Sequence, residues 1–204
     1  MIKKFLLIVV VAISFVNCGN TQSLSTMGQH TFAALRASKS YSTFAQYFVT
    51  ANDCREIALQ ATESAAYNEL NSLADALDEG QVFENRVYRL WSTINTLGKH
   101  FGIDWSKIEY VDWFYRTKNK MGINGGIGTL VFKYNGKYFM ISPTMYKVNN
   151  TYKLAYWGNS FEKILEAIFS SNLIATYQNG QYCLSDGSQK VCYSIAQELN
   201  EMDF

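Results

Sequence analysis

Several residue types are scarce in this sequence of 204 residues, and each shortage excludes a class of protein. The chain has one proline, and 17% of its residues are charged, against 48% hydrophobic and 15% aromatic. Such a composition excludes intrinsic disorder for most of the chain and is typical of one compact domain. The net charge is only +1, whereas a nucleic-acid-binding protein is expected to carry a strong basic excess.

Catalytic and metal-binding motifs are also missing. The sequence contains no GxSxG, HExxH or CxxC pattern, and its two histidines, His30 and His100, are 70 residues apart without a cysteine partner nearby. We therefore expect no metal site and no cofactor.

The amino-terminal residues have the pattern of an export signal. Lys3 and Lys4 precede an apolar run from Phe5 to Val16 that only Ser14 interrupts. This run is too short for a membrane-spanning helix of about 20 residues, but it matches the apolar region of a signal peptide. We predict that residues 1–17 are removed on export, which leaves a net charge of −1; the alternative is a buried amino-terminal helix or strand.

A cysteine follows the apolar run directly. The segment Phe15-Val16-Asn17-Cys18 resembles a bacterial lipobox, although Phe15 and Asn17 replace the usual leucine and small residue. The resemblance implies an exported bacterial lipoprotein of the cell envelope, periplasmic or surface-facing, with a lipid on Cys18 and a tether over residues 18–25. The alternative is that Cys18 is an ordinary residue and the protein is secreted without an anchor.

The other cysteines are consistent with an oxidising compartment. Cys183 and Cys192 would face each other across a hairpin with a four-residue loop, which makes a disulfide between them plausible. Cys54, near the start of an expected helix, would then be a buried free thiol.

Helical signals fill the first half of the chain. Capping boxes at Thr26 with Gln29 and at Thr50 with Asp53 predict helix starts. Helices are expected over residues 26–38, 50–66, 67–79 and 81–101, the last ended by Gly102.

After residue 105 the hydrophobic period changes to that of strands. Strands are expected over residues 108–117, 129–134, 144–148 and 151–157, with residues 122–128 as a flexible hairpin tip. Asn135-Gly136 predicts a type I′ turn that pairs Phe132 with Phe139 and Leu130 with Ile141. A helix over 161–170 and strands over 173–178, 181–185 and 189–195 complete the chain.

This order predicts an α+β fold in which amino-terminal helices pack on a curved antiparallel meander sheet. Residues 26–158 would form this unit, and residues 159–204 a carboxy-terminal helix and small hairpin extension on the same domain. The segments 102–112, 128–138 and 147–154 resemble small exported lipoproteins of the nuclear-transport-factor-2-like fold. The resemblance implies a cone-shaped cavity between helices and sheet, but not one function, because such folds host enzymes, binding modules and scaffolds.

Two residues could serve proton transfer in such a cavity. Asp112 lies in an aromatic strand, where strand alternation puts it on the same face as Tyr110 and Phe114, and burial would raise its pKa. His100 lies in the last turn of its helix, where the helix dipole accounts for it without catalysis. An exposed or salt-bridged Asp112 is the alternative to a catalytic one.

The expected sheet is basic and rich in aromatic rings. Residues 106–160 hold eight basic and two acidic residues. This surface either keeps the edges of the sheet soluble or binds an anionic or carbohydrate-like ligand or an acidic partner protein. The aromatic residues considered for ligand binding are Tyr110, Trp113, Tyr138, Tyr146 and Trp157.

These patterns favour an exported, lipid-anchored binding module for a small molecule or an envelope partner protein, and not for nucleic acid. An enzyme of the dehydratase or isomerase type and a structural interaction protein are the alternatives.

Overall fold

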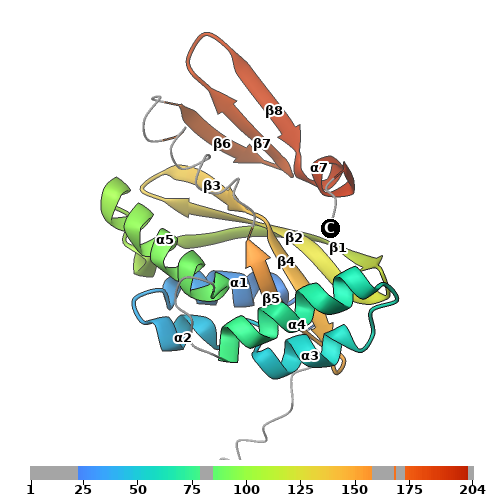
Figure 1. Cartoon of the computed structure of the whole chain (residues 1–204). Helices are drawn as coiled ribbons and strands as arrows, with labels where there is room; N and C mark the ends of the chain where they lie inside the picture. The colour runs from blue at the N-terminus through green and yellow to red at the C-terminus, as the bar shows by residue number, and fades with distance from the viewer. Residues whose placement is uncertain (1–22, 79–84, 158–167, 169–172, 202–204) are drawn as a thin grey trace, which may run out of the picture.

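The computed structural model describes residues 23–78, 85–157, 168 and 173–201, and these residues form three layers (Figure 1). Five helices cover one face of a five-stranded antiparallel sheet, and a three-stranded sheet with a short helix covers the other. The fold is therefore α+β, as the order of sequence patterns predicted.

The five helices are α1 (Met27–Arg36), α2 (Tyr41–Ala45), α3 (Ala51–Ala58), α4 (Ser64–Asp78) and α5 (Arg86–Phe101). Capping residues explain the start of α3 and the end of α5. The capping box at Thr50 and Asp53 is confirmed, with both of its reciprocal hydrogen bonds present. Gly102 ends α5 in the left-handed conformation at φ 64°, also as predicted.

Two helix predictions were wrong in detail. The Thr26 side chain makes no capping bond and donates instead to the carbonyl of Ser23 at 2.9 Å. The helix expected over residues 50–66 ends at Ala58, because the chain turns and Thr62 donates its N–H to the carbonyl of Met121 at 2.8 Å. This bond ties the loop before α4 to the main sheet.

The main sheet has the order β1-β2-β4-β5. The strand β3 also pairs with β2, along residues 130–134, whereas β4 pairs with residues 125–127 of β2. The strands are β1 (Glu109–Lys120), β2 (Ile123–Tyr134), β3 (Lys137–Ile141), β4 (Pro143–Val148) and β5 (Thr151–Trp157). The Asn135-Gly136 turn is confirmed, with both residues at positive φ, and Phe132 pairs with Phe139 and Leu130 with Ile141 as predicted. The free edge of β5 is covered by residues 47–49, which pair with Leu154 in parallel.

The glycine-rich segment was predicted as a flexible hairpin tip, and this was wrong. Residues 123–128 belong to β2, and the turn lies at Met121 and Gly122. Gly128 and Gly28 leave room for the Trp113 ring, which would collide with a Cβ at either position. The glycines therefore serve close packing in this part of the sheet.

A bulge in β1 changes which residues share a face. Tyr110 pairs with Phe132 and Asp112 with Val131, so Val111 is the additional residue. Tyr110 packs edge-on against Phe32 of α1, whereas the Asp112 carboxylate contacts Tyr177 of the small sheet. Simple alternation wrongly placed Tyr110 and Asp112 on the same face.

The small sheet comprises β6 (Ile174–Gln178), β7 (Gln181–Ser185) and β8 (Lys190–Ser194), followed by α7 (Ile195–Glu201). Its fully buried Tyr182 donates to the carbonyl of Tyr138 at 2.8 Å, and Ile195 and Leu199 of α7 join the main core. The helix expected over residues 161–170 lies outside the described residues except for Ile168, and α7 was not expected from the sequence.

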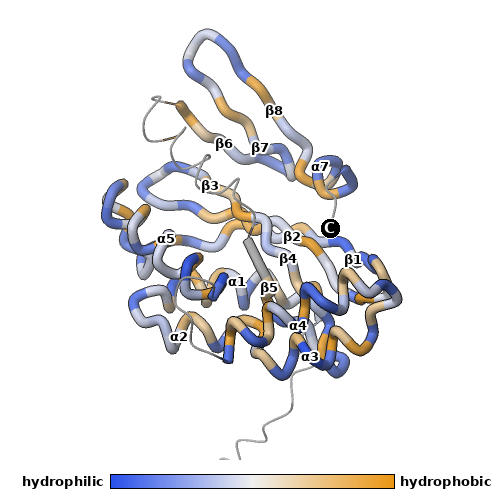
Figure 2. Tube along the Cα trace, viewed as in Figure 1, coloured by the Kyte–Doolittle hydropathy of each residue, from blue (hydrophilic) through white to orange (hydrophobic). Residues whose placement is uncertain are grey.

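Buried side chains of the described residues pack between the helices and the main sheet. Phe44, Phe48, Phe132 and Phe139 are each at most 1% exposed, and the rings of Phe132 and Phe139 stack at 5.4 Å. Along α3 and α4, apolar and polar residues alternate as expected for helices with one covered face (Figure 2). Within the described ranges, no helix is both long and apolar enough to cross a membrane.

Candidate functional site

The cysteines of the described chain lie where the sequence pattern placed them. Cys183 and Cys192 are directly opposite each other on β7 and β8 and form a disulfide. Cys54 is a buried free thiol, and burial, helped by the adjacent Asp53 charge, raises its pKa to about 12. Cys54 is thus protonated at neutral pH and unsuited to nucleophilic chemistry.

Asp112, the first catalytic candidate, takes part in the packing of the two sheets. Its half-buried carboxylate accepts hydrogen bonds from the Tyr177 hydroxyl and, at 2.8 Å, from the backbone N–H of Trp113. Burial, followed by the hydrogen bond to Asp112 and its charge, raises the pKa of Tyr177 to about 12. These contacts describe a hydrogen-bonded join between β1 and β6.

His100 and the aromatic candidates are dispersed over the molecule. The exposed His100 ring contacts only Phe101 among the ring contacts described, at 4.5 Å. Tyr110 and Trp113 pack under α1, Tyr138 packs against Tyr177, and Tyr146 packs against the cluster formed by α3 and α4. The side chain of Trp157 lies outside the described residues. Among those whose side chains are described, the structure does not bring the candidates together in one site.

A different group of polar residues meets where α3 reaches β5. Asp53, in the first turn of α3, is 8% exposed, and its Oδ2 accepts from the backbone N–H of Thr50 at 2.7 Å. The Thr50 hydroxyl donates to the same oxygen at 2.8 Å. The capping box therefore fixes the Asp53 carboxylate at the amino terminus of α3, where the helix dipole also favours a negative charge.

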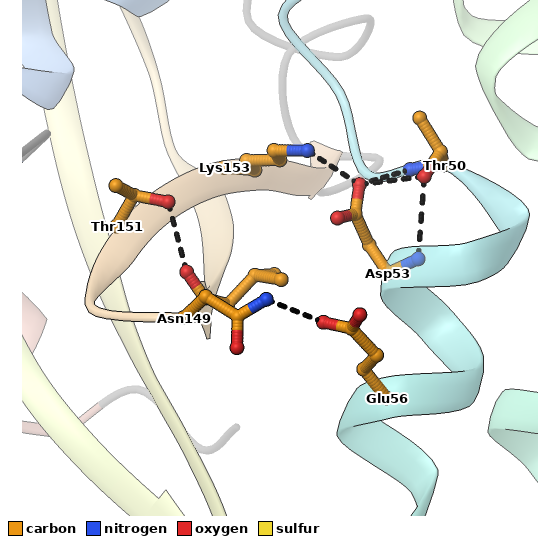
Figure 3. Close-up of polar contacts among 7 residues, drawn as sticks. Thr50, Asp53, Glu56, Asn149, Thr151 and Lys153 are labelled. Atoms are coloured by element: carbon orange, nitrogen blue, oxygen red, sulfur yellow. Dashed lines mark hydrogen bonds and ion pairs between the residues drawn. The ribbon is translucent and has the colours of Figure 1, made fainter. Parts of the chain in front are cut away.

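Lys153 of β5 completes this arrangement from the other side. Its ammonium lies 2.6 Å from Asp53 Oδ2, and the two side chains are 32% and 11% exposed. Figure 3 shows Lys153 pointing from the strand toward the start of α3. Burial alone would raise the pKa of Asp53, but the hydrogen bonds from Lys153 and Thr50 and the Lys153 charge hold that pKa below its usual value.

A pocket of about 230 Å³ opens beside this ion pair. It is lined by His30 of α1, Gln46 and Tyr47 after α2, and Lys153. The rings of His30 and Tyr47 lie edge-on at 6.2 Å, and burial lowers the pKa of His30. His30 is consequently neutral at pH 7, with one nitrogen that donates and one that accepts.

The lining groups are richer in hydrogen-bond donors than in acceptors. Lys153 has three N–H groups and uses one on Asp53, while Gln46, Tyr47 and His30 each add at least one donor. Because the Lys153 ammonium has N–H groups beyond the one it uses on Asp53, and charge-assisted hydrogen bonds are the stronger ones, the pocket suits a small polar molecule that presents a carboxylate oxygen. We call these four lining residues the His30 pocket.

Sequence reasoning missed the His30 pocket. Its four residues come from three segments separated by up to about 120 positions, and His30 has no motif around it. The one available signal was the capping box at Thr50, which located Asp53 but not its partner 100 residues later.

Two further pockets are described. One of about 320 Å³ lies at the end of α5 and includes Asn95, Asp104 and Trp105 in its lining. The other, of about 280 Å³, lies at the turns of the main sheet and is lined by amide side chains and Lys147. Neither Asp112 nor His100 lines any of these three pockets.

Comparisons with family models, curated proteins and solved structures each found no match to this chain. The resemblances to lipoproteins and to the nuclear-transport-factor-2-like fold therefore stay predictions.

Proposed function

We propose that this chain is an exported, lipid-anchored binding module that holds a small polar molecule in the His30 pocket. The convergence of a neutral His30 with the Lys153–Asp53 ion pair in one pocket is the observation that carries the binding part of the proposal. Export and anchoring rest on residues 1–18, and the disulfide between Cys183 and Cys192 is in keeping with an oxidising compartment.

A binding role is favoured over catalysis by how the polar groups are used. The Asp112 carboxylate already accepts hydrogen bonds from Tyr177 and the Trp113 backbone, and Asp53 is held ionised by Lys153 and Thr50. Proton transfer at neutral pH needs a group with a pKa near 7 that can reach a substrate. The lowered pKa of Asp53 does not meet that need, and Asp112 lines none of the three pockets described above.

Binding is tested by NMR titration of the amide signals with acetate and, as a neutral analogue of the same shape, acetamide. We expect acetate to shift the signals of His30, Gln46, Tyr47 and Lys153 at lower concentration than acetamide does. Lys153→Met should remove this preference, whereas Lys190→Met, on exposed β8, should keep it. Equal responses to both probes, or none in the pocket, would refute the proposed ligand chemistry.

Anchoring is tested separately by metabolic labelling with a palmitate analogue. The wild-type protein should take up the label and fractionate with membranes, and Cys18→Ser should abolish both. Labelling that persists in Cys18→Ser would show that another residue carries the lipid, and absence of label in the wild type would remove the anchor.

A further inference from the structure

The pocket lined by amide side chains lies near the first residues of β5, where three connecting segments of the chain meet. Gln60 comes from the loop between α3 and α4, and Asn124 from the start of β2. Lys147 comes from the end of β4, and Asn149 and Asn150 from the turn between β4 and β5. The pocket measures about 280 Å³, and its lining residues are Gln60, Asn124, Lys147, Asn149 and Asn150. We call this set the amide pocket.

Contacts between the three connections hold the walls of the amide pocket in place. The backbone of Thr62 donates to Met121 at 2.8 Å, and Gly122 lies so close to the Gln60 carbonyl that a Cβ would not fit. On the other side, Asn149 Nδ2 donates to Glu56 Oε2 of α3 at 2.7 Å (Figure 3). A pocket fixed in this way loses little entropy when a ligand binds.

The lining of the amide pocket consists mainly of carboxamide side chains. Four of these five described residues carry carboxamides, and Lys147 is the one with a charge. The turn explains Asn149 and Asn150, because both adopt positive φ (45° and 66°), which asparagine tolerates. Gln60, Asn124 and Lys147 lie outside these two turn positions, yet they line the same pocket.

Carboxamides offer a donor and an acceptor side by side, which matches the adjacent hydroxyl groups of a sugar ring. Asn119 Nδ2 donates to Asn124 Oδ1 at 2.9 Å. Asn124 would therefore contact a ligand through its amino group, as a hydrogen-bond donor. The Lys147 ammonium adds a site for a carboxylate, since charge-assisted hydrogen bonds are the stronger ones. The volume is just below the range of about 300–1,000 Å³ typical of drug-sized ligands, so it suits one ring.

We propose that the amide pocket binds a single sugar unit that carries a carboxylate. The hydroxyl groups are bound by the amides of Gln60, Asn124 and Asn150, and the carboxylate by Lys147. The proposal does not depend on the His30 pocket, which shares no residue with it.

NMR titration of the full chain with D-glucuronate, D-glucose and acetate tests this proposal. We expect glucuronate to shift the amide and side-chain signals of Asn124, Lys147 and Asn150 at the lowest concentration, glucose at a higher one, and acetate hardly at all. Lys147→Met should weaken glucuronate binding about tenfold and leave glucose unchanged.

A second variant separates ligand contacts from folding. Asn150→Gly keeps the turn, because glycine adopts positive φ freely, and removes one amide. It should weaken both sugars, whereas the control Lys190→Met should weaken neither. Acetate shifts at the amide-pocket signals as large as those of glucuronate would overturn sugar recognition, and so would the absence of sugar shifts in the amide pocket. Shifts confined to the His30 pocket would overturn this inference while supporting the proposed function.

Discussion

The ion pair between Asp53 and Lys153 should be one of the stronger pairwise polar interactions in the described chain. Fully exposed pairs contribute about 0–1 kcal/mol, whereas removal of one partner from a buried pair costs about 3–5 kcal/mol. With side chains 11% and 32% exposed and a separation of 2.6 Å, this pair lies between those limits. We expect a coupling free energy of about 1–2 kcal/mol in a double-mutant cycle of Asp53→Asn and Lys153→Met.

The pH dependence of this coupling follows from the lowered pKa of Asp53. A carboxylate whose folded pKa is below its unfolded value of about 3.9 stabilises the fold at pH above that value. The stabilisation is lost as the pH falls through the folded pKa. The coupling should therefore be constant between about pH 5 and 7 and should shrink below pH ~3.

Urea unfolding followed by tryptophan fluorescence measures the four free energies of unfolding in the cycle. A matched control is the pair of Arg55 and Asp78, which is just as close at 2.7 Å but has side chains 40% and 53% exposed. Its coupling should stay below about 1 kcal/mol. Equal coupling free energies for the two pairs would refute the role of burial. A coupling between Asp53 and Lys153 that persists in acid would refute the role of the ionised carboxylate.

Three further changes test other parts of the structure. Replacing Cys183 and Cys192, which are nine positions apart, together by serine should lower the free energy of unfolding by about 2–3 kcal/mol, measured in urea. His30→Gln should flatten the pH dependence of stability, because a folded pKa below 6.5 penalises the fold as the pH falls through 6.5. Gly128→Ala should cost about 1–3 kcal/mol by pressing on the Trp113 ring, with a change in tryptophan fluorescence.

Each of these changes has its own control. Reduction of the wild type should match the double serine variant, and a difference would indicate damage by serine itself. His30→Asn should flatten the pH dependence as His30→Gln does, and an unchanged pH dependence in both variants would contradict the assignment to His30. Trp113→Leu should recover part of the stability of Gly128→Ala, and strictly additive losses would contradict the steric reason.

Local chemistry allowed some elements to be predicted to the residue. A type I′ turn needs positive φ at both central positions, which Asn135 and Gly136 adopt. The turn type and the pairing of Phe132 with Phe139 therefore followed from this dipeptide. Gly102 and the Thr50 capping box are also decided within one helical turn. Such features depend on neighbours in the sequence.

Features decided by distant contacts were out of reach. The bulge at Val111 reversed the expected face of Tyr110, and periodicity gives no sign of such an insertion. The glycines of β2 resembled a flexible tip because the tryptophan that covers Gly128 comes from another strand. The His30 pocket likewise needed the pairing of residues 47–49 with Leu154 before His30 and Lys153 could meet.

The basic sheet expected to attract an acidic partner finds several of its partners within the chain. Arg116 donates to the carbonyl of Asn200 at 2.9 Å, and Lys133 lies 5.6 Å from the centre of the Tyr138 ring. Lys107 pairs with Asp104, and Lys153 with Asp53. The small sheet also covers part of the face on which a large partner would dock. Several of the positive charges of the sheet are thus engaged in contacts within the chain. Lys153 and Lys147 each line a pocket, and they are the basic residues of the sheet best placed to bind a small ligand.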